Sequence, residues 1–562
     1  MTRPLFVAFE GIDGSGKTSL SGAVAAALRR EGLRVEHVRE GGRFASAAVQ
    51  RIRELGRDAR NALLCEEAEL LLFLARDVQL LDEAILPALE RADVVIADRC
   101  FHTAEVLARF GRGLPEARVT PLVSAFASRR EPDLVVLVDA DPHVAVARRR
   151  VRKVLHPDAK PPSRKGLSGA GLQQRLRRGY LELARRDPAR WRVLENDAEP
   201  LARARERALD LVRAALEGRP PPPGPPPRGA ATRRTGPAPE DARAAFLAWI
   251  DRRIAGDPMV GAYFLSGTHG PGLDERRLAL AGTDAAPVVA WGLRGLDDAV
   301  SWRLRHALAA RLPALVARSL ERLSSPEAWA LRRVLAAGEG ARAVAESLEG
   351  DGEGAWALRE ALRARHPLEV VASLGGLDGE RSWTMREAWL ASVGGIDALG
   401  EFPAARAAAR SVRGLGSERA WELRLAALAG SPPDALASLE GVDDARAWAL
   451  RERYVARAGK AVFRSLPGVD DPRAWRLREA EAHRCKEAVD SILGLDVPGA
   501  WRLREATAEA WPSTVVKSLG PLAASGPGRA LVAALLTRLP EHPSLLKHAA
   551  MLFPPAPVAP AP

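Results

Sequence analysis

A glycine-rich segment near the N-terminus, FEGIDGSGKTSL from Phe9 to Leu20, carries the residues best suited to chemistry. It fits G-x-x-x-x-G-K-[ST], a pattern whose glycines let backbone N–H groups turn toward phosphate oxygens with no side chain in the way. The lysine reaches the outer phosphates of a nucleoside triphosphate, and the hydroxyl after it holds Mg²⁺. The sequence therefore predicts that ATP and Mg²⁺ bind at Gly11, Ile12, Asp13, Gly14, Ser15, Gly16, Lys17, Thr18 and Ser19.

The elements around this segment are those that such a loop requires. The apolar run Leu5 to Phe9 predicts a buried strand before it, and Ser19 to Arg30 predicts a helix whose N-terminus adds partial positive charge. Further strands are predicted at 33–39, 94–98, 134–139 and 191–194, with helices between them, the clearest at 66–90. This alternation predicts an α/β fold, a parallel sheet flanked by helices.

A second candidate group lies where the strand VVIAD ends. Asp98 is the last residue of that strand, at the edge where open α/β sheets bind ligands, and it is placed to support Mg²⁺. Arg99 follows directly, and its planar fork of donors suits the phosphate of an acceptor. The two groups together predict phosphoryl transfer, which needs the reacting nucleotides held in line and their charge neutralised.

In order along the chain, these motifs resemble those of a thymidylate kinase. The matching stretches lie within residues 1 to about 215 and are FEGIDGSGKTSL, VREGG near 38–42, AELLLFLARDVQLLDEAILPAL, VVIADR, PDLVVLVDADPHVAVAR and RLRRGYLELARRDPARWRVLEND. The resemblance implies an α/β P-loop nucleoside-monophosphate kinase with a mobile lid. Such an enzyme moves the γ-phosphoryl group of ATP to dTMP, giving dTDP.

The resemblance also implies roles for individual residues. Asp13 would hold the 3′-hydroxyl of the acceptor sugar, Arg39 would contact its phosphate, and Phe73 would either stack on its base or belong to the core. The lid is expected between Arg148 and Gly171, where a basic segment broken by Pro and Gly suits either closure over phosphates or a solvated loop. The expected catalytic residues are Lys17, Asp98, Arg99 and Arg148; the expected substrate-binding residues are Asp13, Arg39, Phe73, Arg76, Arg99 and Thr103; and the expected metal ligands are Thr18 and Asp98.

The sequence departs from the family pattern around the base. The family has an Arg four residues after the stacking Phe, where this chain has Asp77; its arginine is Arg76, about 100° around the helix. Leu107 and Ala108 replace an expected Tyr and Gln, although Thr103 keeps a hydroxyl. Two alternatives therefore stay open: a kinase for another deoxynucleoside monophosphate, and an ATP-binding interaction protein that does not act on dTMP.

Composition divides the chain into parts. Residues 218–239 are dominated by Pro and Gly, which cannot pack a core, and they predict a linker. The predicted organisation is a kinase domain at 1–217, this linker, an α-helical repeat domain at 240–555 and a disordered tail at 556–562.

The second half repeats the signature S-L…G-[LV]-D-x-x-x-A-W-x-L-R. Its tryptophans recur every 26 or 27 residues except across one gap of 38, interpreted as two short units split at Ser392 and Phe402. Two short helices per unit must stack to bury their apolar faces, so a HEAT-like solenoid that binds a protein partner is predicted. The tryptophans are predicted as spacers between units, an exposed aromatic ladder being the alternative. In one unit, Asp443 or Asp444 caps a helix that Gly459 ends.

The net charge, the cysteine count and the lengths of the apolar runs limit the class of protein that this chain can belong to. The net charge is +12, but only eight of the 83 basic residues are Lys, so the Arg excess indicates coding bias and does not favour nucleic-acid binding. Three scattered cysteines, no 18-residue apolar run and no room for a signal peptide predict a cytoplasmic protein without disulfides, zinc or a membrane span. A homodimer through the kinase domain is an expected assembly.

Overall fold

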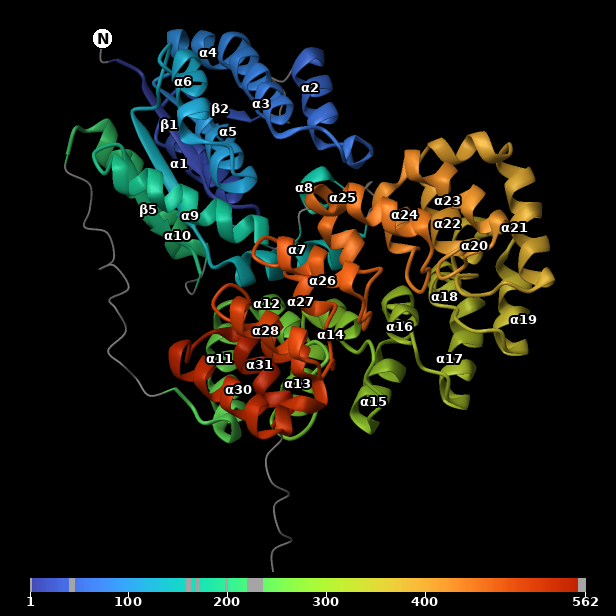
Figure 1. The fold of residues 1–562 in the computed structure, drawn as a ribbon. Coiled ribbons are helices and arrows are strands. Elements are labelled where there is room, and N and C mark those ends of the chain that lie inside the picture. The colour runs from blue at the N-terminus through green and yellow to red at the C-terminus, as the bar shows by residue number, and fades with distance from the viewer. Residues whose placement is uncertain are drawn as a thin grey trace, which may run out of the picture. The chain divides into compact units, whose positions relative to one another are not determined.

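The computed structural model describes residues 3–39, 46–157, 163–167, 169, 171–197, 201–219 and 236–553 (Figure 1). The chain forms two compact units, Met1–Arg149 with Ala170–Arg233, and Arg150–Gly169 with Arg234–Pro562. The predicted tail at 556–562 and most of the predicted linker at 218–239 lie outside the described residues.

The first unit is built on a sheet of five parallel strands in the order β2-β3-β1-β4-β5. The strands are β1 Leu5–Glu10, β2 Val35–Arg39, β3 Val94–Asp98, β4 Leu134–Asp139 and β5 Trp191–Glu195. The three central strands are almost wholly buried, as expected for apolar runs in a sheet covered on both faces. The predicted parallel α/β fold is confirmed.

Helices cover both faces of this sheet. One apolar core joins the sheet to α3, α5 and α9, and another joins its other face to α1 and α10. The predicted helix at 66–90 is α3 continued by a π-helical turn at 81–85 and by α4. The helices are α1 Lys17–Arg30, α2 Ala47–Arg57, α3 Glu66–Leu80, α4 Leu86–Arg91, α5 Phe101–Val106, α6 Glu116–Ala127, α7 Pro142–Leu155, α9 Gly171–Arg186 and α10 Leu201–Leu216.

Strand register brings the predicted site residues to one edge of the sheet. Asp98 is paired in register with Phe9 on one side and with Arg39 on the other. The glycine-rich loop leaves this edge after β1, so the two candidate groups found in the sequence lie at the carboxyl ends of neighbouring strands.

The second unit is helical in the part of the chain that the structure describes. First helices alternate with short second helices, apart from α8 Arg164–Leu167 and α11 Ala242–Gly256. The first helices are α13 Leu273–Ala281, α15 Ala299–Leu308, α17 Pro326–Ala336, α19 Glu353–Leu362, α21 Glu380–Val393, α23 Glu418–Gly430, α25 Ala445–Phe463, α26 Pro472–Glu481, α28 Pro498–Thr507 and α30 Gly526–Arg538. The separate second helices are α12 Pro258–Phe264, α14 Ala286–Gly292, α16 Pro313–Ser319, α18 Ala341–Glu346, α20 Pro367–Ala372, α22 Ala404–Ser411, α24 Pro432–Ala437, α27 Glu487–Asp490, α29 Pro512–Leu519 and α31 Pro543–Leu552.

The row of second helices returns to its own start. Successive second helices pack against each other, and α31 packs against α29 and also against α11 and α12 (Figure 1). Lys547 of α31 donates to the backbone oxygen of Ser266, 2.5 Å away and 281 residues earlier in the chain. Stacked helix pairs are as predicted; closure of the array is a feature that the repeat signature did not indicate, and the HEAT-like type stays a prediction.

Two predicted details of the repeat change in the structure. The 38-residue interval holds one unit: Ser392 lies inside α21, and Phe402 lies between a 3-10 turn at 396–400 and α22. The interpretation as two short units is therefore wrong. Asp444 caps α25 by accepting from the N–H of Ala447, and the helix kinks at Ala458, one residue before the predicted break.

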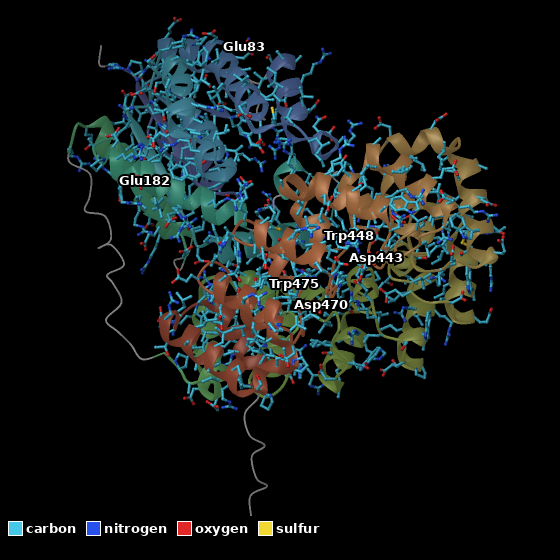
Figure 2. The ribbon with its side chains drawn as sticks, viewed as in Figure 1. Glu83, Glu182, Asp443, Trp448, Asp470 and Trp475 are labelled. Carbon is cyan, nitrogen blue, oxygen red and sulfur yellow. The ribbon has the colours of Figure 1, made fainter. Side chains whose placement is uncertain are left out.

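The repeat tryptophans are mostly spacers, as predicted. Five of the eight are buried and the other three, Trp329, Trp475 and Trp501, are half-buried. Their indole N–H groups commonly donate to an Asp five residues earlier, as Trp475 does to Asp470 at 2.7 Å and Trp448 does to Asp443 (Figure 2). An exposed aromatic ladder is excluded for the buried five.

A buried arginine three residues after the tryptophan joins consecutive units. Arg478 is fully buried, and its guanidinium carbon lies 4.6 Å from the centre of the Trp475 ring. It donates to Ser491 Oγ at 2.9 Å, to the Val469 oxygen at 2.7 Å and to the Leu466 oxygen at 2.9 Å. Burial lowers the pKa of Arg478 to about 10. The repeated Ser of the signature is thus an acceptor for this arginine.

We expect Arg478→Ala to destabilise the repeat unit by about 3 kcal/mol, because three acceptors, two of them buried, lose their donor. Arg476→Ala, on the exposed side of the same helix α26, should change stability by less than about 0.5 kcal/mol. Urea unfolding of the full chain, followed by circular dichroism at a helical wavelength, compares the two variants. Equal urea midpoints for the two variants would contradict a stabilising role of the buried Arg478.

Candidate active site

The glycine-rich loop runs from the end of β1 to the start of α1. Gly11, Gly14 and Gly16 have φ of 142°, 94° and 101°, which side chains rarely allow. A Cβ at these positions would lie 2.4 Å from the Val138 oxygen, 2.3 Å from the Ala145 oxygen and 2.5 Å from Asn196 Nδ2, respectively. The loop conformation therefore depends on glycine at all three positions.

Lys17 is held inside the loop. Its ammonium donates to the Ile12 oxygen at 3.1 Å and lies 3.9 Å from Asp13 Oδ1. Burial, followed by the charge of Arg99, lowers the pKa of Lys17 to about 8. A phosphate at this position would favour the charged amine, so the site is suited to an anion.

Thr18 and Asp98 meet across the loop. Thr18 Oγ1 donates to Asp98 Oδ2 at 2.6 Å, while the buried Asp98 Oδ1 accepts no hydrogen bond from any described residue. Hydroxyl and carboxylate oxygens are ligands that Mg²⁺ takes, and it fills its other positions with phosphate oxygens and water. The described residues contain no group of three or more His, Cys, Asp or Glu able to hold a metal. The residues present fit Mg²⁺.

Arg99 is strained and heavily bonded. Its φ of 84° is unusual for a residue other than glycine, and such strain clusters at functional sites. One guanidinium nitrogen donates to Asp13 Oδ1 at 2.5 Å, and the other donates to Thr103 Oγ1 at 3.0 Å and Tyr180 OH at 3.2 Å. Arg99 thus links the glycine-rich loop to α5 and α9.

Glu10, which was not predicted from the sequence, is hydrogen-bonded to Thr103 and so belongs to the same network as Arg99. It is fully buried, and its carboxylate accepts from the Cys100 N–H at 2.9 Å and from Thr103 Oγ1 at 2.8 Å. Burial raises the pKa of Glu10. An acidic residue ending an apolar strand was the available signal for it.

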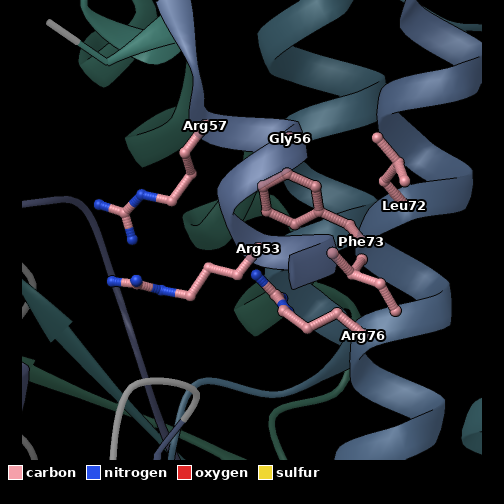
Figure 3. Close-up of a pocket in the computed structure, with 7 residues that line it drawn as sticks. Arg53, Gly56, Arg57, Leu72, Phe73 and Arg76 are labelled. Atoms are coloured by element: carbon pink, nitrogen blue, oxygen red, sulfur yellow. The ribbon is translucent and has the colours of Figure 1, made fainter. Parts of the chain in front are cut away.

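The predicted base site lies on α3. Arg76 stacks over the Phe73 ring at 4.5 Å and donates to Asp77 Oδ1 at 2.8 and 2.6 Å, with all three side chains buried. Figure 3 shows Phe73 and Arg76 beside Arg53 and Arg57 of α2, around Gly56. Phe73 belongs to the core cluster, as do Leu107 and Ala108, which stand at the expected Tyr and Gln positions.

Comparison with known proteins decides the family. The thymidylate kinase family model matches residues 9–205. A thymidylate kinase of Trichlorobacter lovleyi is 34% identical over 196 residues, which cover 35% of this chain and 91% of the relative. A thymidylate kinase of Solidesulfovibrio magneticus is 35% identical over 197 residues, covering 35% of this chain and 93% of the relative. This chain belongs to the thymidylate kinase family. It is an ATP-dependent nucleoside-monophosphate kinase.

The first residues of the predicted lid segment are helical and do not form a loop. Arg148 lies within α7, which continues to Leu155, because the helix-breaking Pro and Gly residues start only at Pro157. Arg148 donates to the Asn196 oxygen at 2.8 Å, and Asn196 Nδ2 donates to the Ser15 oxygen at 2.6 Å. Arg148 therefore supports the glycine-rich loop from a helix. Residues 158–162, and Gly41 and Gly42 of VREGG, lie outside the described residues.

Other residues of the kinase site came only from the structure. The Asp13 N–H donates to Gln173 Oε1 at 3.0 Å, and Arg177 donates both its bonds, at 2.7 Å each, to Asp139 at the end of β4. Arg39, whose role the resemblance implied, is exposed and pairs in register with Asp98. No helix among the described residues is long and apolar enough to cross a membrane.

A half-buried histidine next to the kinase site, whose ring Nδ1 is buried, predicts acid sensitivity. His102 packs edge-on against Trp191 at 4.8 Å, and burial lowers its pKa to about 4. The unfolded chain takes up this proton at about pH 6.5, so stability present above that pH is lost as pH falls toward 4. We expect His102→Phe to remove about 2 kcal/mol of the loss between pH 7 and 5, measured by calorimetry. An equal loss in wild type and variant would contradict this.

Proposed function

We propose that this kinase transfers the γ-phosphoryl group of ATP to dTMP, giving dTDP, with Mg²⁺ bound to the nucleotide. The observation that supports the proposal is the convergence of Lys17, the Thr18–Asp98 pair and the Arg99–Asp13 pair at one edge of the sheet. Lys17 and Arg99 lie 3.9 and 2.5 Å from the same Asp13 oxygen, so a proposed donor for the triphosphate and a proposed donor for the acceptor phosphate are close enough to hold two nucleotides for transfer.

In this mechanism the chain supplies charge and position. Lys17 and the N–H groups at the start of α1 bind the transferring phosphate, and Thr18 and Asp98 hold Mg²⁺, which when bound neutralises phosphate charge. Arg99 and Arg39 orient the acceptor phosphate, and Asp13 accepts from the 3′-hydroxyl of the sugar. Arg148 acts on the shape of the loop through Asn196 and Ser15.

Around the base, Phe73, Arg76 and Thr103 are the proposed contacts.

A second candidate function, phosphorylation of another deoxynucleoside monophosphate, is favoured by the buried Arg76–Asp77 pair, because an arginine already held by a carboxylate has fewer donors for a base. The helical repeats at 240–555 are proposed to bind a protein partner, and the kinase domain at 1–217 is proposed to form a homodimer.

Steady-state kinetics of the full chain with dTMP, dUMP, dCMP, dAMP and dGMP at saturating Mg²⁺–ATP tests the acceptor. We expect kcat/KM for dTMP to exceed that for each other monophosphate by about tenfold or more, since polar groups that match one base reject the others. Preference for another base would support the second candidate. Binding of ATP without transfer to any monophosphate would support an ATP-binding interaction protein.

A further inference from the structure

Lysine is rare in this chain, and half of its lysines lie near the C-terminal end of the helical second unit. Of the eight lysines, Lys460, Lys486, Lys517 and Lys547 are the only ones beyond residue 165. They lie in α25, immediately before α27, in α29 and in α31, and these helices pack one against the next. Four lysines spread over 88 residues of sequence therefore fall on or directly beside four neighbouring helices, and from residue 166 onward all other strongly basic residues are arginine.

The carboxylates near these lysines are too few to neutralise them. Lys486 and Lys517 share one carboxylate, Asp490, at 2.9 and 3.1 Å. Lys547 donates to the neutral Ser266 oxygen at 2.5 Å, and among the residues that the structure describes neither it nor Lys460 forms an ion pair. Glu487 is the other nearby acid, and its charge acts on both Lys460 and Lys486. Two carboxylates, Asp490 and Glu487, thus act on three of the lysines, and Lys547 contacts a backbone oxygen.

The surroundings make the charge of two of these lysines, Lys460 and Lys547, unfavourable. Burial and then the neighbouring Lys517 lower the pKa of Lys547 to about 8, and burial and then Arg464 lower that of Lys460 to about 8. The pKa of the adjacent His548 falls to about 3, because of burial and of Lys547. Lys517 is exposed and the other three lysines are half-buried, so a solute can reach them. An anion bound among them would offset the cost of the unpaired ammonium groups.

We propose that Lys460, Lys486, Lys517 and Lys547 form a binding site for a small oligophosphate anion. Ammonium groups are compact charges with three donors each, and they bind phosphate oxygens as point charges. Several ammonium groups on neighbouring helices suit a ligand whose negative charges are spread along a chain of oxygens. A ligand with a single carboxylate would suit them less well. Asp490 orients two of the four. The ligand is either an inorganic oligophosphate or the phosphate chain of a nucleotide.

Calorimetric titration of the full-length Lys17→Ala chain with inorganic tripolyphosphate tests this site with the kinase loop weakened. We expect one bound tripolyphosphate, and affinity at least about tenfold lower when Lys460→Gln and Lys547→Gln are added. The control pair Arg303→Gln and Arg502→Gln removes the same charge from exposed positions on α15 and α28, and should change the affinity less than twofold.

Lys517→Gln is a second variant whose exposed side chain is not needed for packing, and it should weaken binding about threefold or more even if the double variant fails to fold. A parallel titration with ATP separates the two sources: equal affinity identifies the phosphate chain as the ligand, and tighter binding identifies a nucleotide. Absence of tripolyphosphate binding, or binding that both lysine variants retain unchanged, would overturn the proposal.

Discussion

Replacing Lys17 with alanine is expected to lower kcat about 10³-fold while leaving the fold intact. The ammonium lies within the loop that we propose binds the transferring phosphate, and loss of one preorganised donor to developing charge commonly costs 10²–10³-fold. Because burial lowers the pKa of Lys17, its removal relieves a desolvation cost and should not reduce stability.

The measurement is kcat for dTMP phosphorylation at saturating ATP, with circular dichroism and thermal unfolding to verify the fold. Arg30→Ala is a matched control, since Arg30 is an exposed cation at the far end of the same helix α1. Wild-type turnover in folded Lys17→Ala protein would remove Lys17 from the catalytic site.

Arg99→Ala is expected to reduce kcat/KM for the acceptor monophosphate about 10²-fold and to affect the KM for ATP much less. The Arg99 fork joins Asp13, Thr103 and Tyr180 on the side of the loop assigned to the acceptor. Losing a charge-assisted, bidentate contact to phosphate corresponds to about 3 kcal/mol.

Arg99→Lys is the informative companion, because it keeps the charge and loses the planar fork. It should recover part of the acceptor affinity and leave the KM for ATP near the wild-type value. A loss confined to ATP in both variants would show that the two nucleotide sites have been exchanged in our assignment.

Short-range patterns in the sequence were enough to predict the loop of the kinase site and the strand and helix on either side of it. Glycine spacing, an apolar strand before it and a helix after it lie within about 25 residues, so Lys17, Thr18 and the loop were predictable. Asp98 followed from its place at the end of a buried strand. Two partners of Arg99 were not predictable, because Glu10, whose carboxylate lies 3.9 Å from Arg99, and Tyr180 are 89 and 81 residues away in sequence and only the fold brings them to it.

The same limit applies to the lid and to the repeats. Basic residues around Arg148 suggested a loop, but nothing breaks the helix until Pro157. The repeat period located each Trp and Ser, whereas nothing in the sequence indicated that the arginine of the signature is fully buried, which is rare for arginine. Closure of the array depends on contacts between α31 and α11, far beyond any repeat period.

The central claim is that this chain transfers phosphate to dTMP through the loop around Lys17. It is tested most directly by ³¹P NMR of the full-length protein with ATP, Mg²⁺ and dTMP. The account predicts that the phosphorus resonances of dTDP and ADP rise together in equal amounts, and that both are lost in Lys17→Ala. Loss of ATP without dTDP, or no reaction of ATP while it binds to the wild-type protein, would contradict it.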